Sequence, residues 1–265
     1  MNGLHPSWAD QKKIVIGMLH LPALPGAPLS KLKLDAIRDF VSRDLAAFLE
    51  GGVDGLMMEN FGDVPFYPGR VPEAVAEQMT MIAADIRKQT ELPLGINVLR
   101  NDGLSALTIA HEAKANFVRV NVLSGARVTD QGIIQGIAHD LLRERARLKA
   151  EAIKIFADVD VKHSAPLAVR PLKDEVDDLI ERALADAIVV SGAGTGKATD
   201  LNKVRDVKRF AAETPVFVGS GVTPETIRDF AAADGFIVGT AVKQDGVVSF
   251  PVESTRVKAL MAAIR

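Results

Sequence analysis

The sequence predicts a single (β/α)8 barrel, the TIM-barrel fold, over residues 1–265, and three observations favour it. Eight short apolar runs alternate with longer amphipathic segments, the length suits eight strand–helix units, and glycine-rich strand ends come late in the chain. Strict alternation indicates parallel strands, because a parallel pair needs a crossover connection. The competing architecture, an open doubly wound sheet, would place a glycine-rich phosphate turn after the first strand. The first run ends instead in HLPALPG, so the closed barrel is favoured.

Each expected strand is a short apolar run bounded by polar or turn-forming residues. In chain order the runs are IVIGMLH from Ile14, GLMMEN from Gly55, LGINVL from Leu94, FVRVNV from Phe117, IKIFADVD from Ile153, AIVVSG from Ala187, PVFVGSG from Pro215 and GFIVGT from Gly235.

Apolar residues that recur every three or four positions predict helices between these runs. The clearest segments are residues 35–52, 72–90 and 130–150. The Gly51–Gly52 pair predicts the end of the first helix, and Thr223–Pro224 predicts a helix N-terminus before the last strand. Two loops rich in Pro and Gly, residues 23–33 and 61–71, are long enough to act as lids.

Composition argues against several classes of function. The chain has 32 Lys and Arg against 34 Asp and Glu, which provides no basic surface for nucleic acid or anionic lipid. The absence of cysteine excludes disulfides, thiolate nucleophiles and Cys-ligated zinc. No run resembles a signal peptide or approaches the ~20 apolar residues of a membrane span. We therefore expect a cytoplasmic protein with no nucleic-acid partner and no transmembrane segment, and a barrel of this kind is compatible with a homo-oligomer.

Polar side chains interrupt two strands that are neighbours in the predicted barrel. Arg119 and Asn121 share one face of FVRVNV, while Asp158, Asp160 and Lys162 share one face of IFADVDVK. We expect these five side chains to converge in the interior, where neighbouring charges shift each other's pKa values and support acid–base chemistry. The alternative is a structural ion-pair network centred on Arg119 and Asp158, because buried charges are tolerated only when paired.

Further polar residues close other strands at the face where barrels carry their sites. Glu59 is a candidate catalytic base, because a carboxylate after the apolar run LMM must leave the core there. His20, Asn60 and Asn97 are expected to orient a substrate together with the guanidinium and amide of the fourth strand. For His20, a hydrogen-bonded structural role is an equal alternative.

Lys162 and the residues around it allow two further interpretations. A desolvated lysine can be activated as a Schiff-base nucleophile, so Lys162 is a candidate for that role as well as for acid–base chemistry. His163 follows the fifth strand, and with Asp158 and Asp160 it forms a candidate ligand set for a divalent metal ion. No tight ligand spacing supports the metal site.

The segment SGAGTGKATD after the sixth strand resembles a nucleoside-triphosphate loop but fails as one. That loop has the pattern G-x-x-x-x-G-K-[ST]. Here Gly192 and Gly196 are one residue too close, and Ala198 occupies the hydroxyl position. Small residues at the ends of three successive strands predict instead a site for a phosphomonoester or another anion, although any one glycine could serve only a tight turn. The expected phosphate-binding residues are Ser191, Gly192, Gly194, Thr195, Ser220, Gly221, Gly239 and Thr240.

Several long blocks of the sequence together resemble the BtpA family, also called BtpA/SgcQ. They are GMLHLPALPG, GGVDGLMMENFGDVPFY, GINVLRND, FVRVNVLSGARVTDQG, FADVDVKH and SGAGTGKATD, in this order and nearly from end to end. The resemblance implies a ribulose-phosphate-binding-type barrel but no particular reaction, since the family has no established set of catalytic residues. Cyanobacterial members are associated with photosystem I accumulation, and other bacterial members are described as enzymes encoded near sugar-phosphate genes.

Two functions are therefore open at this point. One is an enzyme acting on a phosphorylated sugar or a similar small metabolite. The other is a non-catalytic assembly or stability factor for a membrane complex, which would need an exposed apolar patch or a basic amphipathic helix. The sequence shows neither clearly.

Overall fold

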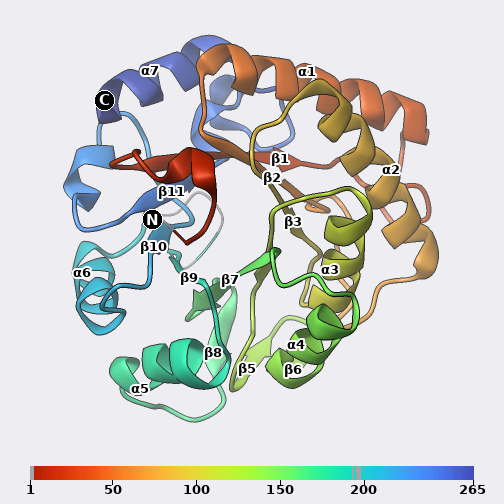
Figure 1. Ribbon diagram of the computed structural model, residues 1–265. Coiled ribbons are helices and arrows are strands. Elements are labelled where there is room, and N and C mark those ends of the chain that lie inside the picture. Colours follow the sequence, from red (N-terminus) through yellow and green to blue (C-terminus); the bar gives the residue numbers. More distant parts are fainter. Residues whose placement is uncertain (1–2, 193, 195–197) are drawn as a thin grey trace.

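The computed structural model describes residues 3–192, 194 and 198–265, and these form a closed barrel of eight parallel strands (Figure 1). Consecutive barrel strands pair side by side, and the last strand pairs with the first. The predicted barrel is confirmed, and each predicted strand is present. The strands are β1 (Ile14–His20), β2 (Gly55–Glu59), β3 (Leu94–Asn97), β4 (Phe117–Val120), β7 (Lys154–Val159), β9 (Ala187–Val190), β10 (Val216–Val218) and β11 (Gly235–Val238).

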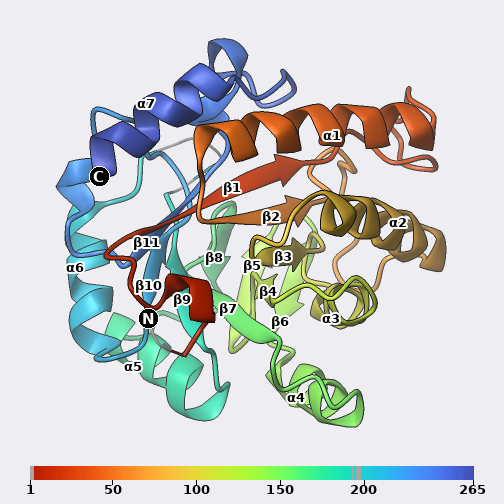
Figure 2. The same cartoon turned by 45° about the horizontal axis from the view of Figure 1, so that its top comes forward.

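Helices surround the barrel and cover its outer face (Figures 1 and 2). The first helix ends as predicted: its last residue is Gly51, and Gly52 has a φ of +79° with its N–H donated to the Phe48 carbonyl. Apolar residues between strands and helices form one large core. The helices are α1 (Leu34–Gly51), α2 (Glu73–Gln89), α3 (Gly103–Glu112), α4 (Ala138–Arg147), α5 (Leu172–Asp177), α6 (Leu201–Phe210) and α7 (Ser254–Ile264). A π-helix (Asp178–Arg182) continues α5, and among the described residues no helix is both long and apolar enough to cross a bilayer.

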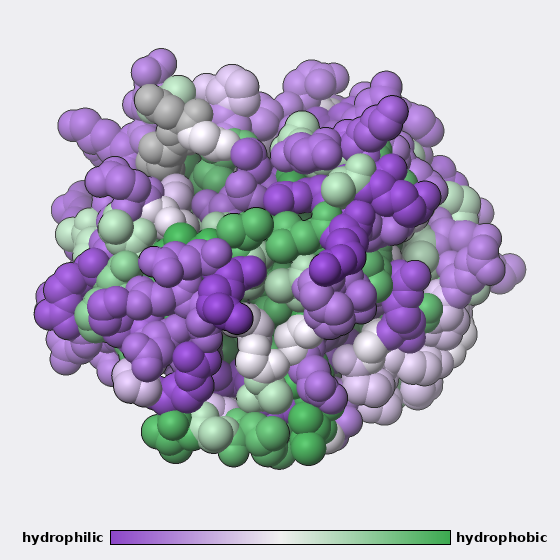
Figure 3. Space-filling model, turned by 60° about the horizontal axis from the view of Figure 1, so that its bottom comes forward, coloured by the Kyte–Doolittle hydropathy of each residue, from purple (hydrophilic) through white to green (hydrophobic). Residues whose placement is uncertain are grey.

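The prediction of a helix from residue 130 is wrong for the first part of that segment. β6 (Gly132–Gln135) lies there and pairs with β5 (Ala126–Thr129), which also pairs with β8 (Ser164–Pro166). Ile133 is 56% exposed and Ile134 is buried, which is the alternation of a strand. α4 begins only at Ala138. Figure 3 shows the molecule from the side that carries this small antiparallel sheet, where several groups of apolar side chains lie among hydrophilic ones.

The predicted helix after Thr223 is also different, because only a short 3-10 helix, Ile227–Phe230, forms there. The Thr223 carbonyl accepts hydrogen bonds from the N–H groups of Thr226 and Ile227. Residues 219–223 line the cavity described below, so only residues 224–234 remain to reach β11. That connection is too short for a full helix such as those after the other strands.

Aromatic side chains fill the barrel at the amino ends of the strands. Trp8, in the 3-10 turn Pro6–Trp8, lies 5.8 Å from the Phe117 ring and donates its indole N–H to the Asp54 carbonyl. Phe117 stacks on Phe156 at 4.5 Å, and Phe156 lies 5.0 Å from Phe217. These side chains close the amino end of the interior, which leaves the carboxyl end for a site.

Candidate functional site

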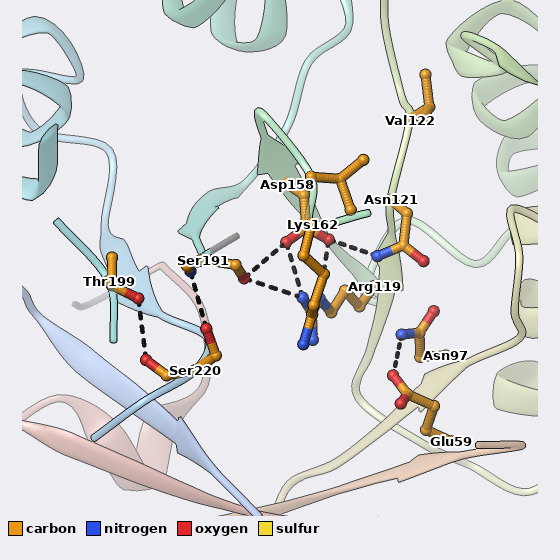
Figure 4. Close-up of polar contacts among 12 residues, drawn as sticks. Glu59, Asn97, Arg119, Asn121, Val122, Asp158, Lys162, Ser191, Thr199 and Ser220 are labelled. Carbon is orange, nitrogen blue, oxygen red and sulfur yellow. Dashed lines mark hydrogen bonds and ion pairs between the residues drawn. The ribbon is translucent and has the colours of Figure 1, made fainter. Parts of the chain in front are cut away.

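A bidentate ion pair occupies the centre of the carboxyl end of the barrel (Figure 4). Arg119 donates from Nε to Oδ2 of Asp158 at 3.0 Å and from Nη2 to Oδ1 at 2.7 Å. Asn121 donates to the same Oδ2 at 2.7 Å, and the Ser191 hydroxyl donates to Oδ1 at 3.4 Å. All four residues are buried, and Asn121 Oδ1 has no hydrogen-bond partner among the described residues. Both oxygens of Asp158 are thus occupied in holding the guanidinium and the amide.

Glu59 and Asn97 lie opposite each other at the ends of β2 and β3. Asn97 Nδ2 donates to Glu59 Oε2 at 2.6 Å, and Glu59 is 7% exposed. No described residue donates a hydrogen bond to Oε1 of Glu59. A carboxylate held through one oxygen with the other available is suited to accept a proton from a ligand.

His20, the last residue of β1, lines the same cavity as a neutral ring. It packs edge-on against Phe61 with ring centroids 4.8 Å apart, and a Cβ at Gly239 would lie 2.4 Å from its Cε1. Burial, followed by the charges of Lys243 and Lys162, lowers the pKa of His20 to about 3. Its Nδ1 is buried and has no hydrogen-bond partner among the described residues.

Two cations lie beyond the ends of their strands at the cavity. Lys162 follows β7 and lies beside Arg119 (Figure 4). Burial, followed by the charge of Arg119, lowers the pKa of Lys162. Arg100 follows β3, is 5% exposed and donates a hydrogen bond to the Lys162 carbonyl. The sequence prediction missed Arg100, whose only signal was a charged side chain just past a strand end at the functional face.

Asp160 does not join this cluster, so the predicted convergence of five side chains is wrong for that residue. β7 ends at Val159, and Asp160 has a φ of +55°, which breaks the alternation on which the prediction relied. Asp160 forms ion pairs with Arg127 and Lys203 instead.

The proposed metal ligands are not brought together. Asp158 is committed to Arg119, Asp160 is paired outside the cavity, and His163 is exposed. Within residues 3–192, 194 and 198–265, no group of three or more His, Cys, Asp or Glu side chains is arranged to hold a metal ion.

Asn60 anchors a loop and does not line the cavity next to Glu59. Its amide donates to Asp63 at 3.1 Å, and its carbonyl oxygen accepts from the Leu99 N–H at 2.7 Å. Asp63 in turn accepts from the Leu24 N–H at 2.8 Å. The two predicted lid loops are therefore linked to each other through Asp63.

Ser220 lies at the centre of the small-residue rim formed by the last three strands. Its hydroxyl accepts a hydrogen bond from the Gly192 N–H at 2.8 Å, and its carbonyl accepts one from the Thr199 hydroxyl at 2.9 Å. A Cβ at Gly219 would lie 2.7 Å from Ser191 Oγ, so only glycine allows β10 to end this close to the ion pair. These two hydrogen bonds connect the rim to the segment that follows β9.

The predicted phosphate-binding residues have different outcomes. Four line the cavity: Ser220, Gly221, Gly239 and Thr240. Gly192 donates its N–H to Ser220, and Ser191 donates to Asp158. Gly194 is buried and does not line the cavity, and Thr195 lies outside the described residues.

The cavity consists of two adjoining hollows of about 140 and 250 Å³. Both are lined by Glu59, Phe61, Arg119 and Lys162. The smaller hollow extends to the rim around Ser220, and the larger one extends to Arg100. A ligand in both hollows would pass directly over the titratable groups.

Known proteins similar to this chain come from several lineages. An uncharacterized protein of Thermococcus kodakarensis is 46% identical over 252 residues, which are 95% of each chain. The photosystem I biogenesis protein BtpA of Synechocystis sp. is 43% identical over 251 residues, covering 94% of this chain and 87% of that protein. Among solved structures, (S)-3-O-geranylgeranylglyceryl phosphate synthase of Thermoplasma acidophilum has a TM-score of 0.58 at 18% identity, covering 96% of this chain and 94% of that chain. At that identity the likeness concerns the fold alone.

The sequence profile of the BtpA family matches residues 11–265, which span the barrel and all the cavity residues described above. Together with identities above 40% to full-length relatives, this match shows that the chain belongs to the BtpA family.

Proposed function

We propose that the chain binds a small phosphorylated metabolite at the carboxyl end of its barrel and catalyses a proton-transfer reaction on it. The observation that carries this proposal is a single cavity that joins a rim of small residues to Glu59, Lys162 and His20. Small residues leave backbone N–H groups accessible to a phosphate. A glycerol-phosphate ligand in the similar barrel of the Thermoplasma acidophilum synthase supports the same ligand class.

The environments of the titratable groups suggest their roles. Glu59 acts as the general base, and Lys162, whose pKa is lowered by burial, acts as proton donor or as a Schiff-base nucleophile. His20 is neutral and serves as a hydrogen-bonding group. Arg119 orients the substrate, and Asp158 is a positioning residue that acts through Arg119.

Binding and turnover with a panel of sugar phosphates test this assignment. The Glu59→Gln variant should bind its ligand like the parent and lose turnover by roughly 10²- to 10⁴-fold, which is the usual contribution of a positioned acid or base. Ser220→Ala combined with Gly221→Ala should weaken binding instead. A parent protein that binds no phosphorylated compound, or a Glu59→Gln variant with parental turnover, would contradict the proposal.

The Schiff-base role of Lys162 has its own test. Borohydride should trap a covalent adduct between a carbonyl-containing substrate and the parent protein but not the Lys162→Met variant. Lys173→Met, at an exposed lysine on α5, is the matched control and should leave trapping unchanged. Absence of an adduct assigns Lys162 to proton transfer alone.

A second candidate function, an assembly factor for a membrane complex, is favoured by the name of the Synechocystis relative and by one surface feature. Val128, Ile133, Leu167 and Val169 expose 43 to 92% of their surface on or next to the β5–β6–β8 sheet. Exposed apolar patches often mark interaction surfaces. Complementation of a Synechocystis strain that lacks its own relative separates the two functions: Glu59→Gln should fail if catalysis is required, and Ile133→Asp should fail if this surface is required.

A further inference from the structure

The larger hollow of the cavity is lined by both apolar and charged side chains. Phe61, Val64, Phe66 and Leu99 provide the walls, and Arg100 and Lys162 provide cationic groups. Walls of this kind suit a planar or apolar part of a ligand, while the cations provide donors for an anionic part.

Arg100 and Lys162 differ in their ion-pair partners from Arg119, which also lines the cavity. Arg119 is neutralised by the bidentate contact with Asp158. Arg100 and Lys162 form no ion pair within the part of the chain that the structure describes, although Glu59 and Asp130 line the same hollow. Buried charges are normally paired, because an unpaired charge loses its hydration without compensation. Arg100, at 5% exposure, is therefore an exception that needs an explanation.

The contact between the two residues holds them as a unit. Arg100 Nη2 donates to the Lys162 carbonyl, so the guanidinium is fixed next to the backbone that carries the ammonium group. A guanidinium has five N–H donors, and this is the only hydrogen bond from the Arg100 side chain to a described residue. The remaining donors and the lysine ammonium are available to a bound anion.

We propose that Arg100 and Lys162 form a second anion-binding position, so that the ligand of this cavity carries two anionic groups. One group, a phosphate, binds at the rim around Ser220, and the second, a carboxylate or another phosphate, binds at Arg100 and Lys162. The part of the ligand between them lies against Phe61 and over Glu59. The inference that the ligand carries two anionic groups rests on the proposed phosphate site. The second anion-binding position is argued independently, from the contacts of Arg100 and Lys162.

Titration calorimetry on the full chain tests this proposal with four probes: inorganic phosphate, ribose 5-phosphate, ribulose 1,5-bisphosphate and 3-phosphoglycerate. The bisphosphate or the phosphocarboxylate should bind the parent roughly 10- to 100-fold more tightly than ribose 5-phosphate, as expected for added charge-assisted hydrogen bonds. Arg100→Gln, which keeps a hydrogen-bond donor on a shorter, uncharged side chain, should remove this advantage and leave the affinity for ribose 5-phosphate unchanged. Arg100→Lys, which keeps the charge, should retain much of it.

The matched control is Arg70→Gln, because the Arg70 side chain is 65% exposed and lies outside the cavity lining. It should leave all four affinities unchanged. Equal affinities of the parent for one-anion and two-anion probes, or equal losses for both in Arg100→Gln, would overturn the proposal. Circular dichroism of each variant confirms that a lost affinity reflects the site and not the fold.

Malonate separates a failure of this proposal from a failure of the phosphate site. Malonate binding that disappears in Arg100→Gln supports the second position even if no phosphorylated probe binds. If ribose 5-phosphate binds and neither malonate nor any two-anion probe depends on Arg100, the phosphate site stands and the second position is wrong.

Discussion

The two ends of the barrel interior are built on the same strands and have opposite chemistry. On β4, Phe117 and Arg119 are two residues apart and both point inward, and on β7 the same relation holds for Phe156 and Asp158. The next inward-facing position on each strand therefore leads from an aromatic layer, which contains Phe117 and Phe156, to a charged layer, which contains Arg119 and Asp158. The aromatic layer is closed by Trp8, whereas the charged layer borders the cavity.

The difference teaches what each end of the interior requires in order to be stable. Stacked aromatic rings are stabilised by removal of apolar surface from water, and they need no polar partner. A buried ion pair must compensate the desolvation of both charges, and apolar residues of similar volume would often be as stable or more stable. The charged layer is therefore expected to be stable only when it is complete, and it lies beside the cavity at which we propose that a ligand binds.

The largest effect is expected from breaking the charged layer. Asp158→Ala leaves Arg119 buried without its partner, which should lower the free energy of unfolding by about 3–5 kcal/mol and abolish ligand binding. Denaturation in urea measures the loss. The double variant Arg119→Met with Asp158→Leu should recover most of the stability and still bind no ligand. A double variant as unstable as the single one would show that the charged layer itself stabilises the barrel.

A smaller effect is expected in the aromatic layer. Phe156→Leu removes part of the contact with Phe117 and Phe217, and should lower the free energy of unfolding by about 1–2 kcal/mol. Because Phe156 lies one layer below Asp158, ligand affinity should not change. Urea denaturation and calorimetry on the same preparation test both statements. A large loss of affinity in Phe156→Leu would mean that the two layers are coupled, contrary to the comparison.

The sequence predicted the barrel and the charged layer for the same physical reason. Within a strand, side chains alternate strictly between two faces, so Arg119, Asn121 and Asp158 were correctly expected to meet. For residues at the ends of strands, the sequence predicted only that they lie at the carboxyl end of the barrel. That was sufficient for Glu59 and Asn97, because the register between β2 and β3 places these two residues opposite each other.

The remainder of the site lies beyond the strand ends, where the alternation of side chains between two faces no longer predicts which way a side chain points. A positive φ turns Asp160 toward Arg127, and Arg100 reaches the cavity from a loop whose path no periodic pattern determines. The prediction of a helix from residue 130 was wrong for a related reason. Ile133 and Ile134 fit both helical and strand spacing, and pairing with the antiparallel strand β5 selects the strand.

The smallest expected effect is a loss of stability at acidic pH, which should depend on His20 and not on the aromatic layer. His20 has a pKa of about 3 when folded and about 6.5 when unfolded, so the folded state stays neutral between these values while the unfolded state binds a proton. The stability that a neutral His20 contributes is therefore complete above about pH 6.5 and is lost as the pH falls below it. The free energy of unfolding of the parent relative to His20→Asn should decrease by about 1 kcal/mol between pH 6.5 and pH 5.5.

Two controls fix the origin of this dependence. His111→Gln, at an exposed histidine on α3, should show the parental pH profile. Phe156→Leu should show a constant difference from the parent over the same range, because Phe117 and Phe217, the rings next to Phe156, do not titrate. A difference between the parent and His20→Asn that does not change with pH would mean that His20 is solvated and can be protonated in the folded protein. That result would remove the neutral hydrogen-bonding role assigned to His20 and would place a titratable cation in the charged layer.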